Sequence, residues 1–172
     1  MIHISRQIML VTLLGLATLQ GCWNPFAPTE GLLEGDISLS LTEQRSPEEV
    51  LQNFRYAYIY RDSLVYSDLF DTSFVFLYFD PEIGGVGGYD YWGRDTELRT
   101  TARLFRAFDH FTLIWNATIA TDSLAVNKRS LTKTFDLTIG GEIFLSGNAV
   151  FDFISDPEGV WRISRWQDES FF

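Results

Sequence analysis

The sequence predicts one α+β domain in which helices come first and an antiparallel sheet follows. Apolar residues recur at helical spacing in two segments, 46–58 and 94–105. From residue 111 onward, apolar and polar residues alternate with a period of two, which is typical of strands with one buried face. The 172 residues leave room for one domain of ordinary size, so we expect a single packed body with helices against a sheet.

The first 21 residues are interpreted as a removable signal that precedes this domain. Arg6 supplies a basic start, residues 8–19 form an apolar core too short to span a bilayer, and Leu19-Gln20-Gly21-Cys22 follows. The segment resembles a bacterial lipoprotein signal. The resemblance implies that Cys22 is acylated and becomes the first residue of the mature protein, anchored to the membrane by lipid. Cys22 is the only cysteine, so it has no partner for an intramolecular disulfide.

Residues 22–45 are interpreted as a lipid-anchored tether, because prolines and glycines interrupt any regular pattern there. Trp23 follows the cysteine, in place of the aspartate that retains lipoproteins in the inner membrane of some bacteria. We therefore expect the protein in the bacterial cell envelope, on the outer membrane and facing the periplasm.

The net charge of −10 bears on the choice of partner. An acidic surface repels the phosphates of nucleic acids and of anionic lipid head groups. We therefore expect no nucleic acid partner, while neutral and cationic ligands stay open.

Three helices are expected before the long strands. Ser46 as N-cap, Pro47 at the first position and Glu49 completing a capping box predict that the first helix begins here. Asp62 caps a second, shorter helix, and the third spans 94–105.

The remaining elements are strands and turns. A buried strand is expected at 73–79, and a glycine-rich loop at 84–88 is interpreted as a mobile rim that gates a pocket. The period of two then predicts four long strands, at 111–119, 131–139, 143–154 and 160–168.

Three motifs occur in an order and spacing that resemble the NTF2-like (SnoaL-like) superfamily, over residues 46–168. The motifs are Ser46-Pro47-Glu48-Glu49-Val50-Leu51 with Phe54, Ala57, Tyr58 and Asp62 after it, Tyr91-Trp92-Gly93-Arg94-Asp95, and Gly159-Val160-Trp161-Arg162-Ile163-Ser164-Arg165-Trp166-Gln167-Asp168. The resemblance implies an NTF2-like cone over 46–172, with N-terminal helices packed on a curved antiparallel sheet and a pocket at the open end. Members include ketosteroid isomerases, dehydratases, epoxide hydrolases and polyketide cyclases, and also noncatalytic binding and dimerisation modules, so the fold does not choose a chemistry.

The candidate ligand-binding residues are polar or aromatic side chains that a pocket of this kind could use: Tyr58, Trp92, Asn116, Asp136 and Arg165. Asp136 is the candidate base, because burial in a pocket would raise its pKa. Its neighbours Thr134 and Thr138 are polar, however, and alternation alone favours the solvent face. Each of these side chains can equally be structural.

Histidine offers little chemistry. His110 is the only histidine after the leader, and Asp109 beside it should point to the opposite face of a strand. A metal site built on histidine or cysteine lacks ligands, although an all-carboxylate site stays open. We expect no metal and no cofactor.

The leading hypothesis is a lipid-anchored envelope protein whose domain binds a small apolar ligand or a protein partner without catalysis. The alternative is an acid/base enzyme, an isomerase, dehydratase or hydrolase, with Asp136 as base and Tyr58 or Arg165 polarising the substrate. A third hypothesis is an interaction module that uses an exposed sheet face, and a homodimer fits that use.

Overall fold

The computed structural model describes residues 40–171, without the side chain of Phe171. The predicted signal, Cys22 and the tether up to residue 39 lie outside this part of the chain. Within it, no helix is both long enough and apolar enough to cross a membrane.

Helix α2 (Pro47–Tyr60) begins where the sequence predicts. The Ser46 hydroxyl accepts a hydrogen bond from the Glu49 amide at 3.2 Å, which satisfies one free donor of the first turn. The Glu49 carboxylate does not close the box on the Ser46 amide. It accepts from the Arg45 amide at 2.7 Å, one residue earlier. The cap therefore also fixes the chain that leads into the helix.

Two further helices complete the helical layer, and both are predicted correctly. Helix α3 (Ser63–Asp68) is capped by Asp62, whose Oδ1 accepts from the amides of Leu64 and Val65 at 2.9 and 3.0 Å. Helix α4 (Arg94–Ala107) begins after Gly93, which provides no side-chain cap.

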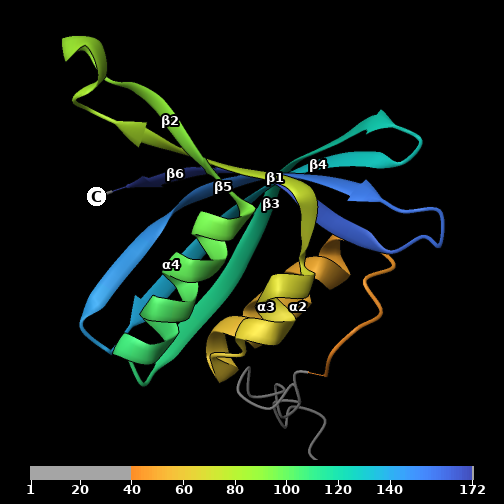
Figure 1. Cartoon of the computed structure of the whole chain (residues 1–172), viewed down its shortest axis with the longest axis horizontal. Helices are drawn as coiled ribbons and strands as arrows, with labels where there is room; N and C mark the ends of the chain where they lie inside the picture. Colours follow the sequence, from red (N-terminus) through yellow and green to blue (C-terminus); the bar gives the residue numbers. More distant parts are fainter. Residues whose placement is uncertain (1–39, 172) are drawn as a thin grey trace, which may run out of the picture. The chain divides into compact units, whose positions relative to one another are not determined.

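Six strands form one sheet, and the described chain is mostly sheet with modest helix content (Figure 1). The strands are β1 (Phe70–Asp80), β2 (Gly88–Gly93), β3 (Phe111–Ala125), β4 (Lys128–Ile139), β5 (Ile143–Ser155) and β6 (Trp161–Phe171), in the spatial order β2-β1-β6-β5-β4-β3. The short helix η2 (Ile83–Gly85) lies between β1 and β2.

The sheet differs from the expectation in two respects. Strand β2 is not predicted, because its residues are largely exposed and show no alternation. The sheet is also not wholly antiparallel, because β1 pairs with β6 in parallel. The first and last strands thus lie side by side, as the second and third strands of the sheet.

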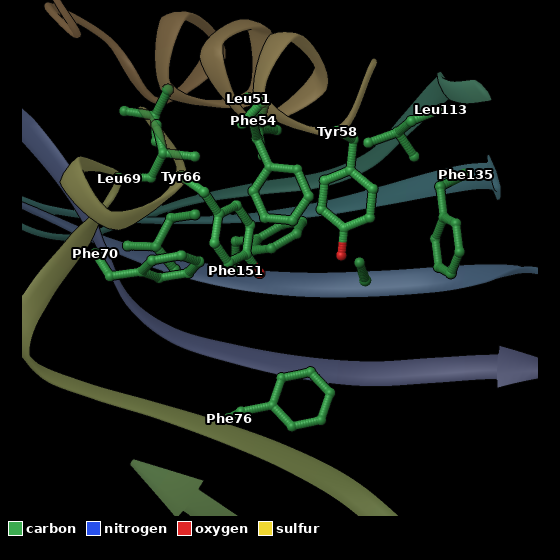
Figure 2. Close-up of a cluster of buried hydrophobic side chains, with 14 of the residues drawn as sticks. Leu51, Phe54, Tyr58, Tyr66, Leu69, Phe70, Phe76, Leu113, Phe135 and Phe151 are labelled. Carbon is green, nitrogen blue, oxygen red and sulfur yellow. The ribbon is translucent and has the colours of Figure 1, made fainter. Parts of the chain in front are cut away.

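The helices cover one face of the sheet (Figure 1). Helix α2 packs against β3 and β6, and α4 packs against β1 and β2. The core between the layers is aromatic (Figure 2). Phe54 of α2 lies at its centre, 1% exposed, and its ring contacts six others: Tyr58, Tyr66, Phe70, Trp115, Phe151 and Trp166.

A β-bulge in β6 decides which side chains of this strand face the helices. Ile163 pairs with Phe153, but the next pair is Arg165 with Asp152, so Ser164 is an extra residue. One extra residue exchanges the two faces of the strand. Trp166 therefore points into the core, where its ring contacts Phe54 at 5.4 Å between centroids.

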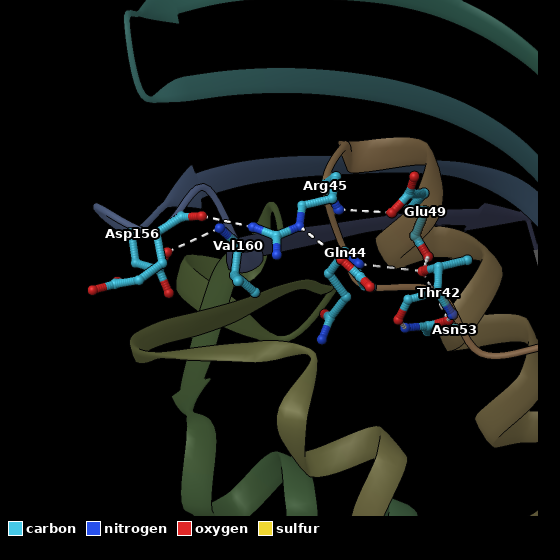
Figure 3. A network of polar contacts seen from close by, with 9 residues as sticks. Thr42, Gln44, Arg45, Glu49, Asn53, Asp156 and Val160 are labelled. Atoms are coloured by element: carbon cyan, nitrogen blue, oxygen red, sulfur yellow. Dashed lines mark hydrogen bonds and ion pairs between the residues drawn. The ribbon is translucent and has the colours of Figure 1, made fainter.

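The last residues of the predicted tether belong to the folded body (Figure 3). The Thr42 amide donates to Oδ1 of Asn53 at 2.8 Å, and the Gln44 carbonyl accepts from the Trp161 amide at 2.8 Å. Arg45 donates through Nη1 to the Glu158 carbonyl at 2.6 Å. These bonds tie the chain ahead of α2 to the start of β6.

Candidate functional site

The interior between helices and sheet is almost filled by side chains. The cavity found there, called here the interior cavity, has a volume of about 20 Å³. That is room for about one water molecule. Its lining is nearly all apolar: Phe54, Tyr58, Leu113, Trp115, Phe135, Leu137, Ala149 and Trp166. Figure 2 shows Tyr58, Leu113 and Phe135 around this space.

A buried carboxylate on α4 lies at one end of this interior. Glu97 is 4% exposed and accepts hydrogen bonds from three neutral donors. Oε1 accepts from the Tyr66 hydroxyl at 2.7 Å and from the Thr101 hydroxyl at 3.0 Å, and Oε2 accepts from the Trp92 indole at 2.7 Å. Since buried carboxylates need such partners, this arrangement holds α3, α4 and β2 together.

The two buried tyrosines beside Glu97 are held in their protonated form. Burial raises the pKa of Tyr58, and the charge of Glu97 adds to the shift. Burial and Glu97 likewise raise the pKa of Tyr66 well above its ordinary value. Both hydroxyls are therefore suited to donate hydrogen bonds and not to act as bases near neutral pH.

A much larger cavity opens where β1 and β6 separate, beyond their last pair, Leu77 with Gln167. Its volume is about 470 Å³, and we call it the mouth cavity. Figure 1 shows the β1–β2 hairpin and the end of β6 pointing apart at this place. The lining combines aromatic rings with carboxylates: Tyr78, Phe79, Pro81, Tyr89, Asp168, Glu169 and Ser170.

Asp168 lies on the wall that β6 contributes to the mouth cavity. It is on the same face of the strand as Trp166, which the bulge at Ser164 turns toward the helices. Its carboxylate accepts from the Ser170 amide at 3.0 Å and from the Ser170 hydroxyl at 3.2 Å. Burial raises the pKa of Asp168 above its ordinary value despite these bonds, and the charge of Glu169 adds to the rise.

The opposite wall is aromatic and comes from the β1–β2 hairpin. Phe79 and Tyr89 are paired residues whose rings meet edge to face, with centroids 5.9 Å apart. The Tyr78 hydroxyl donates to Oδ2 of Asp90 at 3.2 Å. Gly87 in the connecting loop has φ +83°, and a Cβ there would overlap the Phe79 ring. Gly87 thus leaves room for the Phe79 ring in this wall. That the glycine-rich loop is a mobile rim that gates the pocket stays a prediction.

The structure does not bring the five predicted ligand-binding residues together. Tyr58 lines the interior cavity, and Trp92 is half-buried, stacked on Phe76 at 4.5 Å between centroids and bonded to Glu97. Asn116 and Asp136 are both exposed and bond to each other, Nδ2 to Oδ2, at 2.7 Å.

Arg165 also lies away from both cavities. It bonds through its guanidinium to Asp152, at 3.4 Å, and to Gln167, on the sheet face opposite to Trp166. Asp136 lies on that same outer face, between the inward-facing Phe135 and Leu137. The closed apolar environment that a base at Asp136 requires is not present around it.

His110 and Asp109 are both exposed and have different partners. A His110 ring nitrogen lies 3.3 Å from the Thr112 hydroxyl, and Asp109 forms an ion pair with Arg61 at 3.5 Å. Among residues 40–171, no group of three or more histidine, cysteine or acidic side chains is placed to hold a metal ion.

Sequence reasoning missed Glu97 and Asp168. Glu97 carries no local signal, because a glutamate in the first turns of a helix is usually solvated and complements the helix dipole. Asp168 would follow from alternation only if the extra residue at Ser164 were known, since simple counting from Ile163 places Arg165 inside and Asp168 outside.

No family model matches the chain, and no curated protein matches it in sequence. Several solved structures match in fold. A candidate scytalone dehydratase from Novosphingobium aromaticivorans aligns with a TM-score of 0.61 and 14% identity, over 78% of this chain and 87% of that one. A candidate aromatic ring hydroxylase from the same organism has a TM-score of 0.57 and 14% identity, over 76% and 90%.

An NTF2-like superfamily protein from Salmonella enterica serovar Typhimurium aligns with a TM-score of 0.55 and 17% identity, covering 69% of this chain and 84% of that one. Identities this low establish the architecture and leave the chemistry open. The described chain therefore has the NTF2-like fold, with a curved six-stranded sheet covered on one face by three helices.

Proposed function

We propose that this domain binds a small ligand in the mouth cavity without transforming it. The observation that carries the proposal is the size of the mouth cavity compared with that of the interior cavity. The interior cavity, at about 20 Å³, excludes any organic substrate, whereas the mouth cavity, at about 470 Å³, is within the range of small-molecule sites. Aromatic walls suit the apolar body of such a ligand.

The packing of the interior argues against catalysis there. Tyr58 and Trp166 are among the side chains that leave only about 20 Å³ in the interior. The raised pKa values of Tyr58 and Tyr66 keep both hydroxyls protonated. A rigid, filled interior supports the mouth and does not itself offer a reaction chamber.

Native mass spectrometry of the full-length chain, purified gently and compared before and after denaturation, tests the proposal. We expect a copurifying small molecule, or uptake of one from a library of aromatic fragments. Pro81→Trp, which fills the mouth, should abolish binding. Pro157→Trp, an exposed proline in the β5–β6 turn, should not. Binding that survives Pro81→Trp would contradict the proposal, and the same spectra give the oligomeric state.

The acid/base enzyme remains the second candidate, with a different residue. Asp168 lies in the mouth cavity with a pKa raised by burial, which is the property a general base or acid requires. Time-dependent chemical change of the bound molecule, lost in Asp168→Asn, would favour this candidate over simple binding.

We further propose that Cys22 carries the lipid that anchors the domain at the envelope. The support is the signal-like sequence and the single cysteine. The test is a fractionation of cells that express the full chain and Cys22→Ser. Acyl labelling and membrane association should be present only with Cys22, and a labelled or membrane-bound Cys22→Ser would refute the anchor.

A further inference from the structure

The two walls of the mouth cavity differ in chemical character. The β1–β2 wall presents the aromatic rings of Tyr78, Phe79 and Tyr89, of which Phe79 is 53% and Tyr89 52% exposed. The β6 wall contributes two acids whose side chains leave the strand on opposite faces: Asp168 on the face of Trp166, and Glu169, which bonds to Gln167, on the face of Arg165. A ligand that fills this space therefore meets π faces on one side and negative charge on the other.

Within residues 40–171, no ion pair involves the acids of the β6 wall. The ion pairs of residues 40–171 involve Arg45, Arg61, Arg162 and Arg165, and none of them reaches Asp168 or Glu169. In the described part of the chain, the partners of these carboxylates are neutral: Asp168 accepts from Ser170, and Glu169 accepts from the side-chain amide of Gln167 at 2.8 Å.

Two more acids lie near Tyr78 of the aromatic wall, outside the lining of the cavity. Asp80 and Asp90, from β1 and β2, lie close enough to Tyr78 for their charges to act on its hydroxyl. Asp168 is partly withdrawn from water, which raises its pKa. A cation in the cavity would offset the negative charges near Tyr78. It would also supply an opposite charge to the partly desolvated carboxylate of Asp168.

We infer that the mouth cavity selects an organic cation, an alkylated ammonium group carried on a small apolar body. The inference rests on the proposed function and adds the chemical class of the ligand. The ammonium group lies between one acid of β6 and a ring of the β1–β2 hairpin, where cation–π attraction and charge pairing act together. The apolar body occupies the remainder of the aromatic wall. An anionic ligand is excluded by the same charges.

A pair of probes of equal shape tests the inference. 3,3-Dimethylbutan-1-ol has a quaternary carbon where choline has its quaternary nitrogen. Any difference in affinity between the two therefore reports the effect of the positive charge. Calorimetric titration of the full-length chain in neutral detergent should give at least about tenfold tighter binding of choline.

Matched variants locate the effect. The double variant Asp168→Asn with Glu169→Gln should remove the preference for choline, whereas Asp122→Asn, an exposed acid in β3, should leave it intact. Tyr89→Ala should weaken choline binding, whereas Tyr91→Ala, 69% exposed on the same strand and outside the lining, should not.

The outcomes separate this inference from the proposed function. If both probes bind with equal affinity and Tyr89→Ala weakens both, the inference of a cationic ligand is overturned and the proposal of ligand binding stands. A choline preference that persists in the double acidic variant would also overturn it. If neither probe binds while neutral aromatic fragments do, the cation inference fails alone. If nothing binds, both proposals fail.

Discussion

The hydroxyl of Tyr66 donates a 2.7 Å hydrogen bond to Oε1 of Glu97, and both side chains are buried. Tyr66 belongs to α3 and Glu97 to α4, so the bond joins two helices through residues that are 31 positions apart in sequence. Because Glu97 also receives Trp92 from β2, one carboxylate fixes the positions of three elements.

Tyr66→Phe should lower the free energy of unfolding by about 1.5–3 kcal/mol, the typical contribution of a hydrogen bond to a charged group. The ring and its packing are retained, so the loss reports the hydroxyl. Urea unfolding followed by tryptophan fluorescence measures it. Tyr60→Phe, whose ring is 56% exposed, is the control and should change stability little. Equal losses in the two variants would show that Glu97 does not depend on Tyr66.

Asp168→Asn should change the dependence of stability on pH. The folded-state pKa of Asp168 is raised above its ordinary value of 3.8, mainly by burial. Its contribution is therefore most favourable below pH 3.8 and is lost as the pH rises through the folded-state pKa. The variant lacks this loss, so its stability relative to the unmodified chain should rise from acid to neutral pH. Urea unfolding across that range measures the difference, and a flat difference would refute the shift.

Asp156→Asn should show the opposite slope. The Val160 amide donates to Asp156 Oδ1 at 2.9 Å, and this bond, followed by the bond from Arg162, lowers the pKa of the carboxyl below 3.8. The stabilisation is present above the ordinary pKa and is lost as the pH falls through the lowered value. The variant should thus be less stable than the unmodified chain at neutral pH, with the gap closing in acid. A gap that widens in acid would contradict the assignment.

Gly147→Ala should separate the ends of β5 and β6. A Cβ at this position would lie 2.6 Å from the Glu169 carbonyl oxygen and would overlap the backbone of Ser170. Because backbone cannot rotate away as a side chain can, we expect a loss of about 1–3 kcal/mol in thermal unfolding. Ser146→Ala, the exposed neighbour, should be nearly neutral. Unchanged stability of Gly147→Ala would mean that the strands can part without cost.

Local signals predicted the elements that depend on local chemistry. The start of α2 follows from Ser46 and Pro47, and strands β3 to β5 follow from alternation, because these features need only neighbouring residues. Strand β2 was missed because it is held by pairing with β1 across a glycine-rich loop, and its own residues carry no periodicity.

The candidate site was predicted less well, for reasons of tertiary structure. Tyr58 was correctly expected inside, since it continues the apolar stripe of α2. Glu97 is buried because α3 and β2 supply hydrogen-bond donors to it. The sequence of α4 alone does not predict those donors. Asp168, one of the two acids that line the mouth cavity, is displaced from its expected face by one extra residue.

The extra residue Ser164 reverses the inward and outward alternation of side chains within the last strand. Ahead of it, odd-numbered positions such as Ile163 face the core, and after it the even-numbered positions Trp166 and Asp168 do. Before Ser164, even-numbered positions should therefore tolerate substitution better, and after Ser164 odd-numbered positions should. If a relative lacks the bulge residue, an alignment without a gap at Ser164 would match Arg165 to a position that faces the core. The wrong charge would then be assigned to the mouth cavity. The sign of the charge presented to a ligand is set here by the count of residues in a strand as much as by their identity.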